Sequence, residues 1–205
     1  MVWLALLASY LLGAVPTAYL LVKRSTGRDV RTIGSGNVGA TNAMRAAGKR
    51  IGLLVFVLDG MKGVVSAAVI PRWLGGYGDP TLSLACGLAA VVGHDFSCFL
   101  RFEGGKGVAT TIGALLGSMP IIAGIMVASW ALVFWLTRYV SMGSLAAAAA
   151  IPISQWWMGQ PAVDVGLGGA FAALIVVRHR ANVQRLRHGT EHRAGSGRSH
   201  ATLES

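Results

Sequence analysis

Seven apolar runs, separated by short polar segments, make up most of this chain. They occupy residues 3–22, 51–70, 80–93, 107–117, 120–137, 142–158 and 163–177. A helix needs about 20 mostly apolar residues to cross the hydrocarbon core of a bilayer, where no water can satisfy an open backbone. The pattern therefore predicts an all-α integral membrane protein, a bundle of seven transmembrane helices. Because the third and fourth runs are short and contain glycine, six spans is the alternative.

The composition excludes a soluble enzyme. Hydrophobic residues make up 54% of the 205 residues and charged residues 13%, which leaves too few polar side chains to cover a water-soluble globule of this size.

The first run lacks the basic start of a secretory signal, although residues 14–18 include small residues suited to cleavage, so we interpret it as the first span. Residues 1–193 are expected to form a single membrane domain, followed by a small, polar, disordered tail at 194–205.

The lysines and arginines fall on one side of the predicted bundle. Sixteen of the eighteen lie in alternate loops or after the last run, whereas Arg72 lies on the other side and Lys62 lies within a run. Cytoplasmic loops of membrane proteins carry such an excess of positive charge. The pattern places the N-terminus outside and the C-terminus in the cytoplasm. It also accounts for the net charge of +10 without a nucleic-acid partner.

The cysteines and acidic residues give no sign of a metal centre. Cys86 and Cys98 lie in an apolar stretch at a spacing unlike that of disulfide frameworks or zinc sites, and we interpret both as small packing residues. The eight acidic residues do not cluster. The sequence therefore predicts no bound metal and no cofactor.

Residues 34–45 combine three glycines with several polar side chains and an arginine. Glycine lets backbone N–H groups converge on phosphate oxygens, and arginine forms bidentate pairs with phosphate. The candidate phosphate-binding residues are Ser35, Gly36, Asn37, Thr41, Asn42 and Arg45. The glycine spacing also matches the dinucleotide fingerprint, but a span rather than a strand precedes it, so we reject a Rossmann domain. A flexible cytoplasmic loop is the alternative.

A second glycine-rich loop places Lys106 among Gly104, Gly105 and Gly107. The glycines let backbone amides and the ammonium approach one phosphate, and a helix starting after Gly107 adds a favourable dipole. It is not a Walker A motif, because no Ser or Thr follows the lysine. The alternative is that Lys106 only anchors the chain at the membrane interface.

Two pairs of polar residues are spaced for one helix face. Asp59 and Lys62 lie three residues apart in an apolar run, where ionised groups are costly unless they pair, so we expect a structural ion pair, with a direct substrate role as the alternative. Ser141 and Ser144 have the same spacing at the start of the sixth run. Helix capping is their plain alternative to a role in binding.

The segment 178–187 leaves the last run with His179 and Asn182 on one helical face. Both side chains are candidates for substrate contact, His179 to a proton or a phosphate and Asn182 to a hydroxyl. A basic cluster that meets anionic lipid is the alternative. The sequence has no Gly-x-Ser-x-Gly elbow, no His-x4-Asp acyltransferase signature and no His-Glu-x-x-His zinc helix, which argues against a serine hydrolase and a soluble-type acyltransferase.

Together these segments resemble a bacterial membrane family, the PlsY acyl-phosphate:glycerol-3-phosphate acyltransferases. The resemblance covers residues 1 to about 193. Its most specific parts are residues 34–45, Asp59 with Lys62 and Gly63, 93–110, 138–144 and 178–191. It implies a seven-span enzyme of the bacterial inner membrane that moves a fatty acyl group from acyl phosphate to the sn-1 hydroxyl of glycerol 3-phosphate at the cytoplasmic face, giving lysophosphatidate and phosphate.

The resemblance also assigns roles to particular residues. It implies a catalytic set of Arg45, Lys106, Ser144, His179 and Asn182. The implied substrate- and phosphate-binding set is Ser35, Gly36, Asn37, Thr41, Asn42, Gly104, Gly105, Gly107 and Ser141. The partners implied are acyl phosphate, glycerol 3-phosphate and membrane lipid. Because acyl phosphate is already activated, no covalent nucleophile is expected.

Three positions depart from the family pattern. Ser97 stands where proline is frequent, Arg101 where lysine is, and Glu103 where a basic residue is usual. An acid three residues before Lys106 is expected to weaken the local positive field. The alternative functions are a transporter of a phosphorylated metabolite, which would hold its site near the midplane, and a structural scaffold, which would leave Lys106 without a purpose.

Overall fold

The computed structural model describes residues 1–74 and 78–195, and this part of the chain contains helices and no strands. The prediction of an all-helical chain is therefore confirmed. The elements are α1 (Val2–Ala14), α2 (Thr17–Thr26), η1 (Val30–Thr32), α3 (Ala40–Val64), η2 (Val65–Val69), α4 (Ile70–Leu74), α5 (Pro80–Asp95), η3 (Cys98–Leu100), α6 (Val108–Ser118), α7 (Pro120–Thr137), α8 (Val140–Trp157), α9 (Ala162–Arg178) and α10 (Arg180–Arg187).

Four helical segments among the described residues are long and apolar enough to cross a membrane: 2–26, 40–74, 80–100 and 120–137. The bent pair α9 and α10, which meet at 57°, makes a fifth if it counts as one span. The third apolar run gains length from η3. The fourth run stays short, because α6 has only 11 residues and so reaches about 16 Å of the ~30 Å hydrocarbon core.

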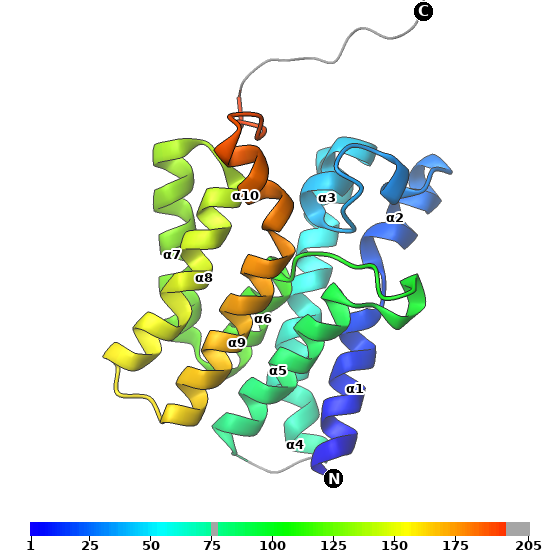
Figure 1. Ribbon diagram of the computed structural model, residues 1–205. Coiled ribbons are helices and arrows are strands. Elements are labelled where there is room, and N and C mark those ends of the chain that lie inside the picture. The colour runs from blue at the N-terminus through cyan, green and yellow to red at the C-terminus, as the bar shows by residue number, and fades with distance from the viewer. Residues whose placement is uncertain (75–77, 196–205) are drawn as a thin grey trace, which may run out of the picture.

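The helices run alternately up and down along the long axis of the bundle (Figure 1). The N-terminus lies at the lower end, whereas α2, the start of α3 and α10 lie at the upper end. The chain turns at Pro16, between α1 and α2, and Val15 there has ψ 119° and leaves the helical range. The polar loops at 27–39 and 96–107 meet in the upper half, where the candidate residues gather.

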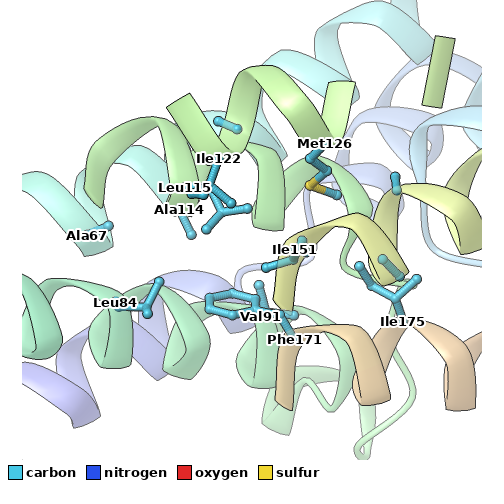
Figure 2. Packing of buried hydrophobic residues seen from close by; sticks show 13 residues of the cluster. Ala67, Leu84, Val91, Ala114, Leu115, Ile122, Met126, Ile151, Phe171 and Ile175 are labelled. Carbon is cyan, nitrogen blue, oxygen red and sulfur yellow. The ribbon is translucent and has the colours of Figure 1, made fainter. Parts of the chain in front are cut away.

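The main core lies between α5, α6, α7, α8 and α9 (Figure 2). Short α6 packs at its centre through Ala114 and Leu115, against Leu84 of α5, Ile122 of α7 and Ile151 of α8. Burying these side chains stabilises the relative positions of the helices. The core thereby fixes the C-terminal end of α5 and the N-terminal end of α6, which carry the second glycine-rich loop.

Glycine residues let α5 and α6, the helices on either side of this loop, approach their neighbours closely. A Cβ atom on Gly13 of α1 would lie 2.0 Å from the Ala90 carbonyl oxygen of α5, and one on Gly113 of α6 would lie 1.8 Å from the Gly60 carbonyl oxygen of α3. Such close contacts between backbones are typical of helix pairs in membranes. They lock α5 to α1 and α6 to α3.

The two cysteines and the C-terminal tail differ in part from the predictions. Cys86 is buried as expected, but Cys98 is exposed, so the prediction that both cysteines pack in the interior was wrong for Cys98. Its position in η3, outside the helical bundle, explains this. Of the predicted disordered tail, the structure describes Ala194, whose N–H donates to the Arg138 carbonyl oxygen at 2.9 Å, and Gly195. Residues 196–205 lie outside the described residues.

Candidate active site

Asn42 organises the first glycine-rich loop from inside. Its side chain is 1% exposed, and its Nδ2 donates to the carbonyl oxygens of Val30, Ile33 and Asn37 at 2.9, 3.0 and 3.0 Å. Its Oδ1 accepts from the Ser35 backbone N–H at 3.1 Å. The polar atoms of this side chain are thus occupied by the loop itself, so the structure gives Asn42 a folding role.

Glycine is required where this loop reverses. Gly34 and Gly36 have φ values of 58° and 69°, and a Cβ atom on Gly34 would lie 2.5 Å from the Asn42 Oδ1 atom. These positions favour glycine because its lack of a Cβ atom permits positive φ. The resulting turn presents Ser35, Gly36 and Asn37 to an open polar pocket.

The second glycine-rich loop is fixed by bonds to its backbone. The Gly105 N–H donates to the His94 carbonyl oxygen at 2.9 Å. Arg178 donates from Nε to the Gly105 carbonyl oxygen and from Nη2 to the Gly104 carbonyl oxygen, both at 2.8 Å, while its guanidinium lies over the Phe96 ring. Gly107, the N-cap residue just before α6, has φ 71°, so the loop turns sharply after Lys106.

Lys106 begins a hydrogen-bond chain that links three distant segments. Its ammonium donates to Oδ1 of Asn182, and Nδ2 of Asn182 donates to Oε1 of Glu191 at 2.7 Å. Glu191 also accepts from Ser141 Oγ at 2.8 Å and from Arg185 Nε at 2.7 Å. The carboxylate therefore orients Asn182 and Arg185 together.

The polar pocket lies between the two glycine-rich loops and α10 and encloses about 220 Å³. Its lining residues are Arg31, Ser35, Gly36, Asn37, Val38, Glu103, Gly104, Lys106, Arg178, Ala181, Asn182 and Arg185. Four of these side chains are cationic and one is a carboxylate. The pocket therefore attracts an anion, with backbone and side-chain donors placed around it.

Burial and neighbouring charges tune the ionisable groups of the site. Burial lowers the pKa of Lys106 to about 8, and the positive charges of Arg185, Arg178 and Arg45 act in the same direction against Glu191. For Glu191, burial acts to raise the pKa, but hydrogen bonds from Asn182, Arg185 and Ser141 outweigh it and lower the pKa. The site thus holds the ionised Glu191 carboxylate behind Lys106, whose ammonium loses its proton at a lower pH than an exposed lysine does.

The structure brings most of the predicted site residues together. Ser35, Gly36, Asn37, Gly104, Lys106 and Asn182 line the pocket. Gly105 and Gly107 flank Lys106 in the same loop.

The other predicted residues lie at or beyond its edge. Ser141 joins the hydrogen-bond chain of Lys106 by donating to Glu191. Ser144 instead donates within its own helix to the Val140 carbonyl oxygen at 3.0 Å. His179 is buried, with Nδ1 2.8 Å from the Ile175 carbonyl oxygen. Thr41 and Arg45 are exposed and do not line the pocket, although Arg45 contributes to the field at Lys106.

Four site residues were missed by the sequence analysis: Arg31, Arg178, Arg185 and Glu191. The arginines were indistinguishable from other basic residues near the membrane. Glu191 carried a signal, because it is the only acidic residue after Asp164 in the described part of the chain. Glu103 does line the pocket, and its charge acts favourably on Arg31.

The expected ion pair between Asp59 and Lys62 is confirmed. Lys62 Nζ lies 2.8 Å from Asp59 Oδ1, and both side chains are buried. This pair lies behind the polar pocket and does not line it.

Comparisons with known proteins identify the family. The chain matches the family model of glycerol-3-phosphate acyltransferase over residues 3–189. It is 42% identical to the glycerol-3-phosphate acyltransferase of Syntrophomonas wolfei, over 91% of this chain and 93% of that protein. It is 44% identical to glycerol-3-phosphate acyltransferase 2 of Moorella thermoacetica, over 94% of this chain and 97% of that protein.

Two solved structures agree with this assignment. Both are crystal structures of PlsY, an integral membrane glycerol 3-phosphate acyltransferase. The glycerol 3-phosphate form matches with a TM-score of 0.88 and 38% identity over 95% of this chain and 96% of that one. The lysophosphatidic acid form matches with a TM-score of 0.82 and 36% identity over 94% of each chain. The chain therefore belongs to the glycerol-3-phosphate acyltransferase family of integral membrane proteins, as its resemblance to PlsY indicated.

Proposed function

We propose that this chain transfers a fatty acyl group from acyl phosphate to the sn-1 hydroxyl of glycerol 3-phosphate, giving 1-acyl-glycerol 3-phosphate and phosphate. The observation that carries the proposal is the polar pocket, where Lys106 and three arginines meet two glycine-rich turns. Two phosphate groups take part in this reaction, and the pocket concentrates positive charge and N–H donors for them. The family to which the chain belongs acts in phospholipid synthesis.

The acceptor phosphate is held by charge and by backbone donors. Lys106 supplies an ammonium on a buried loop, and Arg185 is oriented by Glu191 at 2.7 Å. Ser35 and Gly36 present a turn whose backbone supplies further donors. Holding glycerol 3-phosphate in this way places its hydroxyl near Asn182, whose amide can orient it, so that binding supplies much of the acceleration.

The chemical step needs no covalent intermediate. The sn-1 oxygen attacks the carbonyl carbon of the acyl phosphate, the bond from that carbon to the phosphate oxygen breaks, and the departing phosphate takes the bonding electrons. The hydroxyl proton passes to a phosphate oxygen of a substrate. Lys106, with Arg45 nearby, stabilises the charge that develops on the departing phosphate. The catalytic set proposed for this step is Arg45, Lys106, Ser144, His179 and Asn182, with His179 positioning rather than deprotonating.

The topology proposed for this reaction has seven spans in the bacterial inner membrane. The N-terminus lies outside and the C-terminus lies in the cytoplasm, so the pocket faces the compartment that supplies glycerol 3-phosphate. The alternating helix directions and the gathering of cationic loops at one end support this arrangement (Figure 1). Residues 1–193 act as one domain. A pocket at one end of the bundle also disfavours a transporter, which would hold its site near the midplane.

A comparison of donors tests the proposal. Purified protein in detergent is given labelled glycerol 3-phosphate with either acyl phosphate or acyl-CoA of the same chain length. We expect labelled 1-acyl-glycerol 3-phosphate from acyl phosphate, at a rate at least about 100-fold above that with acyl-CoA. Equal rates with the two donors contradict the donor assignment. No product with either donor contradicts acyl transfer altogether.

A further inference from the structure

A buried polar cluster lies directly behind the glycine-rich loop of Lys106 and is not explained by substrate binding. It consists of Thr17 from α2, Asp59 and Lys62 from α3 and His94 from α5. Three of its groups converge on one atom, Asp59 Oδ1: Thr17 Oγ1 at 2.5 Å, Lys62 Nζ at 2.8 Å and His94 Nδ1 at 3.6 Å. All four residues lie outside the lining of the polar pocket.

Asp59 is held in place by groups from two other helices. Lys62 Nζ also donates to the Val15 carbonyl oxygen at 2.5 Å, a group that the turn at Pro16 leaves at the end of α1. Thr17 begins α2, just after this turn. A buried charge persists only with such partners, so the position of Asp59 Oδ1 is fixed by the turn between α1 and α2.

His94 connects Asp59 to the loop that carries Lys106. One edge of its imidazole faces Asp59, and the opposite edge lies against Gly105. A Cβ atom on Gly105 would lie 1.9 Å from His94 Nε2 and 2.7 Å from both Cδ2 and Cε1, so its three nearest heavy atoms all belong to this ring. The Gly105 N–H also donates to the His94 carbonyl oxygen at 2.9 Å. The Gly105 backbone therefore packs directly against the His94 ring.

We infer that His94 is a positioning residue for the reaction: oriented by Asp59, its ring sets the position of the Gly104–Lys106 turn and hence of the Lys106 ammonium in the pocket. The inference rests on the proposed function for what the turn binds. The path is contiguous, from Asp59 Oδ1 to the His94 ring, from the ring to the Gly105 backbone, and from there to Lys106 and to the carbonyl groups held by Arg178. A shift of the turn by one ångström is enough to cost about 100-fold in rate.

Gly105→Ala and His94→Ala, alone and combined, test this contact. Gly105→Ala alone should collide with the ring, displace the turn and lower kcat/KM for glycerol 3-phosphate by about 100-fold. His94→Ala alone should lower it by about tenfold, mainly through KM, because the turn loses its support. Since His94→Ala removes all three atoms that the new methyl group meets, the double variant should match His94→Ala within about threefold.

Gly104→Ala is the matched control. A Cβ atom there would lie 2.1 Å from the His94 carbonyl oxygen and 2.7 Å from the Asp95 carbonyl group, all of them backbone atoms that His94→Ala leaves in place. The loss caused by Gly104→Ala should therefore persist in the double variant. Rescue of Gly105→Ala without rescue of Gly104→Ala is a result that a general effect of His94 on stability does not produce.

The outcomes separate this inference from the proposed function. If the double variant of His94 and Gly105 is as impaired as Gly105→Ala, or if both glycine variants are rescued alike, the positioning role is wrong even when the wild type transfers acyl groups from acyl phosphate. A wild type without that activity contradicts the proposed function instead. If neither Gly105 variant folds, Asp59→Asn and His94→Ala are compared alone and combined. Their effects on KM should be non-additive, and additive effects would overturn the path from Asp59 to His94.

Discussion

The Lys106 ammonium donates a hydrogen bond to Oδ1 of Asn182, which lies 76 residues further along the chain. This contact joins the glycine-rich loop between α5 and α6 to the final helix α10. It depends on Glu191, which orients the amide of Asn182 from the other side at 2.7 Å. The pocket is therefore assembled from distant segments, and its geometry should respond to changes at any of the three residues.

The pH dependence of activity should reveal the lowered pKa of Lys106. Because burial lowers that pKa to about 8, the ammonium loses its proton as the pH rises through this value, and phosphate binding weakens. We expect kcat/KM for glycerol 3-phosphate to fall above pH 8, approaching about tenfold per pH unit. Lys106→Arg, which stays charged at all these pH values, should lose this alkaline limb.

Other titratable and charged groups face Lys106 and set the baseline of this experiment. They are Arg45, Arg178, His179, Arg185 and Glu191. Hydrogen bonds from Asn182, Arg185 and Ser141 lower the pKa of Glu191, so its carboxylate stays ionised throughout the alkaline range. An alkaline limb that persists unchanged in Lys106→Arg would assign it to a group other than Lys106.

Removal of the Glu191 carboxylate should reduce activity by releasing its partners. Glu191→Ala leaves Asn182, Arg185 and Ser141 without the acceptor that they share, and we expect kcat/KM to fall by about 100-fold. Loss of these hydrogen bonds should also lower the free energy of unfolding by about 2 kcal/mol. Kinetics together with thermal unfolding in detergent measure both effects; Arg72→Ala, at the other end of the bundle, is the control and should retain both properties.

Asn42 should prove important for order in the first loop and not for contact with substrate. Asn42→Ala removes three donated bonds and one accepted bond, and we expect it to lower the free energy of unfolding by about 2–3 kcal/mol. Asn42→Asp, which keeps the acceptor and loses the donors, should be nearly as damaging. Amide hydrogen exchange of residues 30–42 measures the effect; unchanged protection in both variants would contradict this folding role.

The ion pair of Asp59 and Lys62 predicts an asymmetry between single and double changes. Lys62→Ala leaves the Asp59 carboxylate buried without its ammonium partner. We expect this change to lower the free energy of unfolding by about 3–5 kcal/mol. The double variant Asp59→Asn with Lys62→Met removes both charges and should recover most of that loss. Thermal unfolding of the three proteins in the same detergent measures this, and a double variant less stable than Lys62→Ala would show that the charges are needed for more than mutual neutralisation.

The sequence was sufficient to predict the helical bundle and the two loops that form the pocket. Apolar periods define helices directly, and glycines around Lys106 mark a backbone that turns tightly. The lengths of the third and fourth runs left the number of spans open, and the 11 residues of α6 show the reason: core packing, and not length alone, positions this helix.

The roles of individual polar residues were harder to predict. Asn42 and Asn37 look alike in the sequence, yet Asn42 points into its own loop and Asn37 lines the pocket. Arg178 resembled any arginine that follows a membrane span, but it holds the carbonyl groups of Gly104 and Gly105, which lie more than 70 residues earlier. Such roles depend on tertiary contacts between distant segments, and local spacing does not encode them.

We propose that cations on separate loops converge on one pocket and there support acyl transfer. The most direct measurement is the initial rate of 1-acyl-glycerol 3-phosphate formation from acyl phosphate by purified wild type, Lys106→Ala and Arg45→Ala, with correct insertion checked by size-exclusion chromatography in detergent. We predict rapid turnover by the wild type and a loss of at least about 100-fold in each folded variant. Near-normal turnover by both variants would contradict the claim.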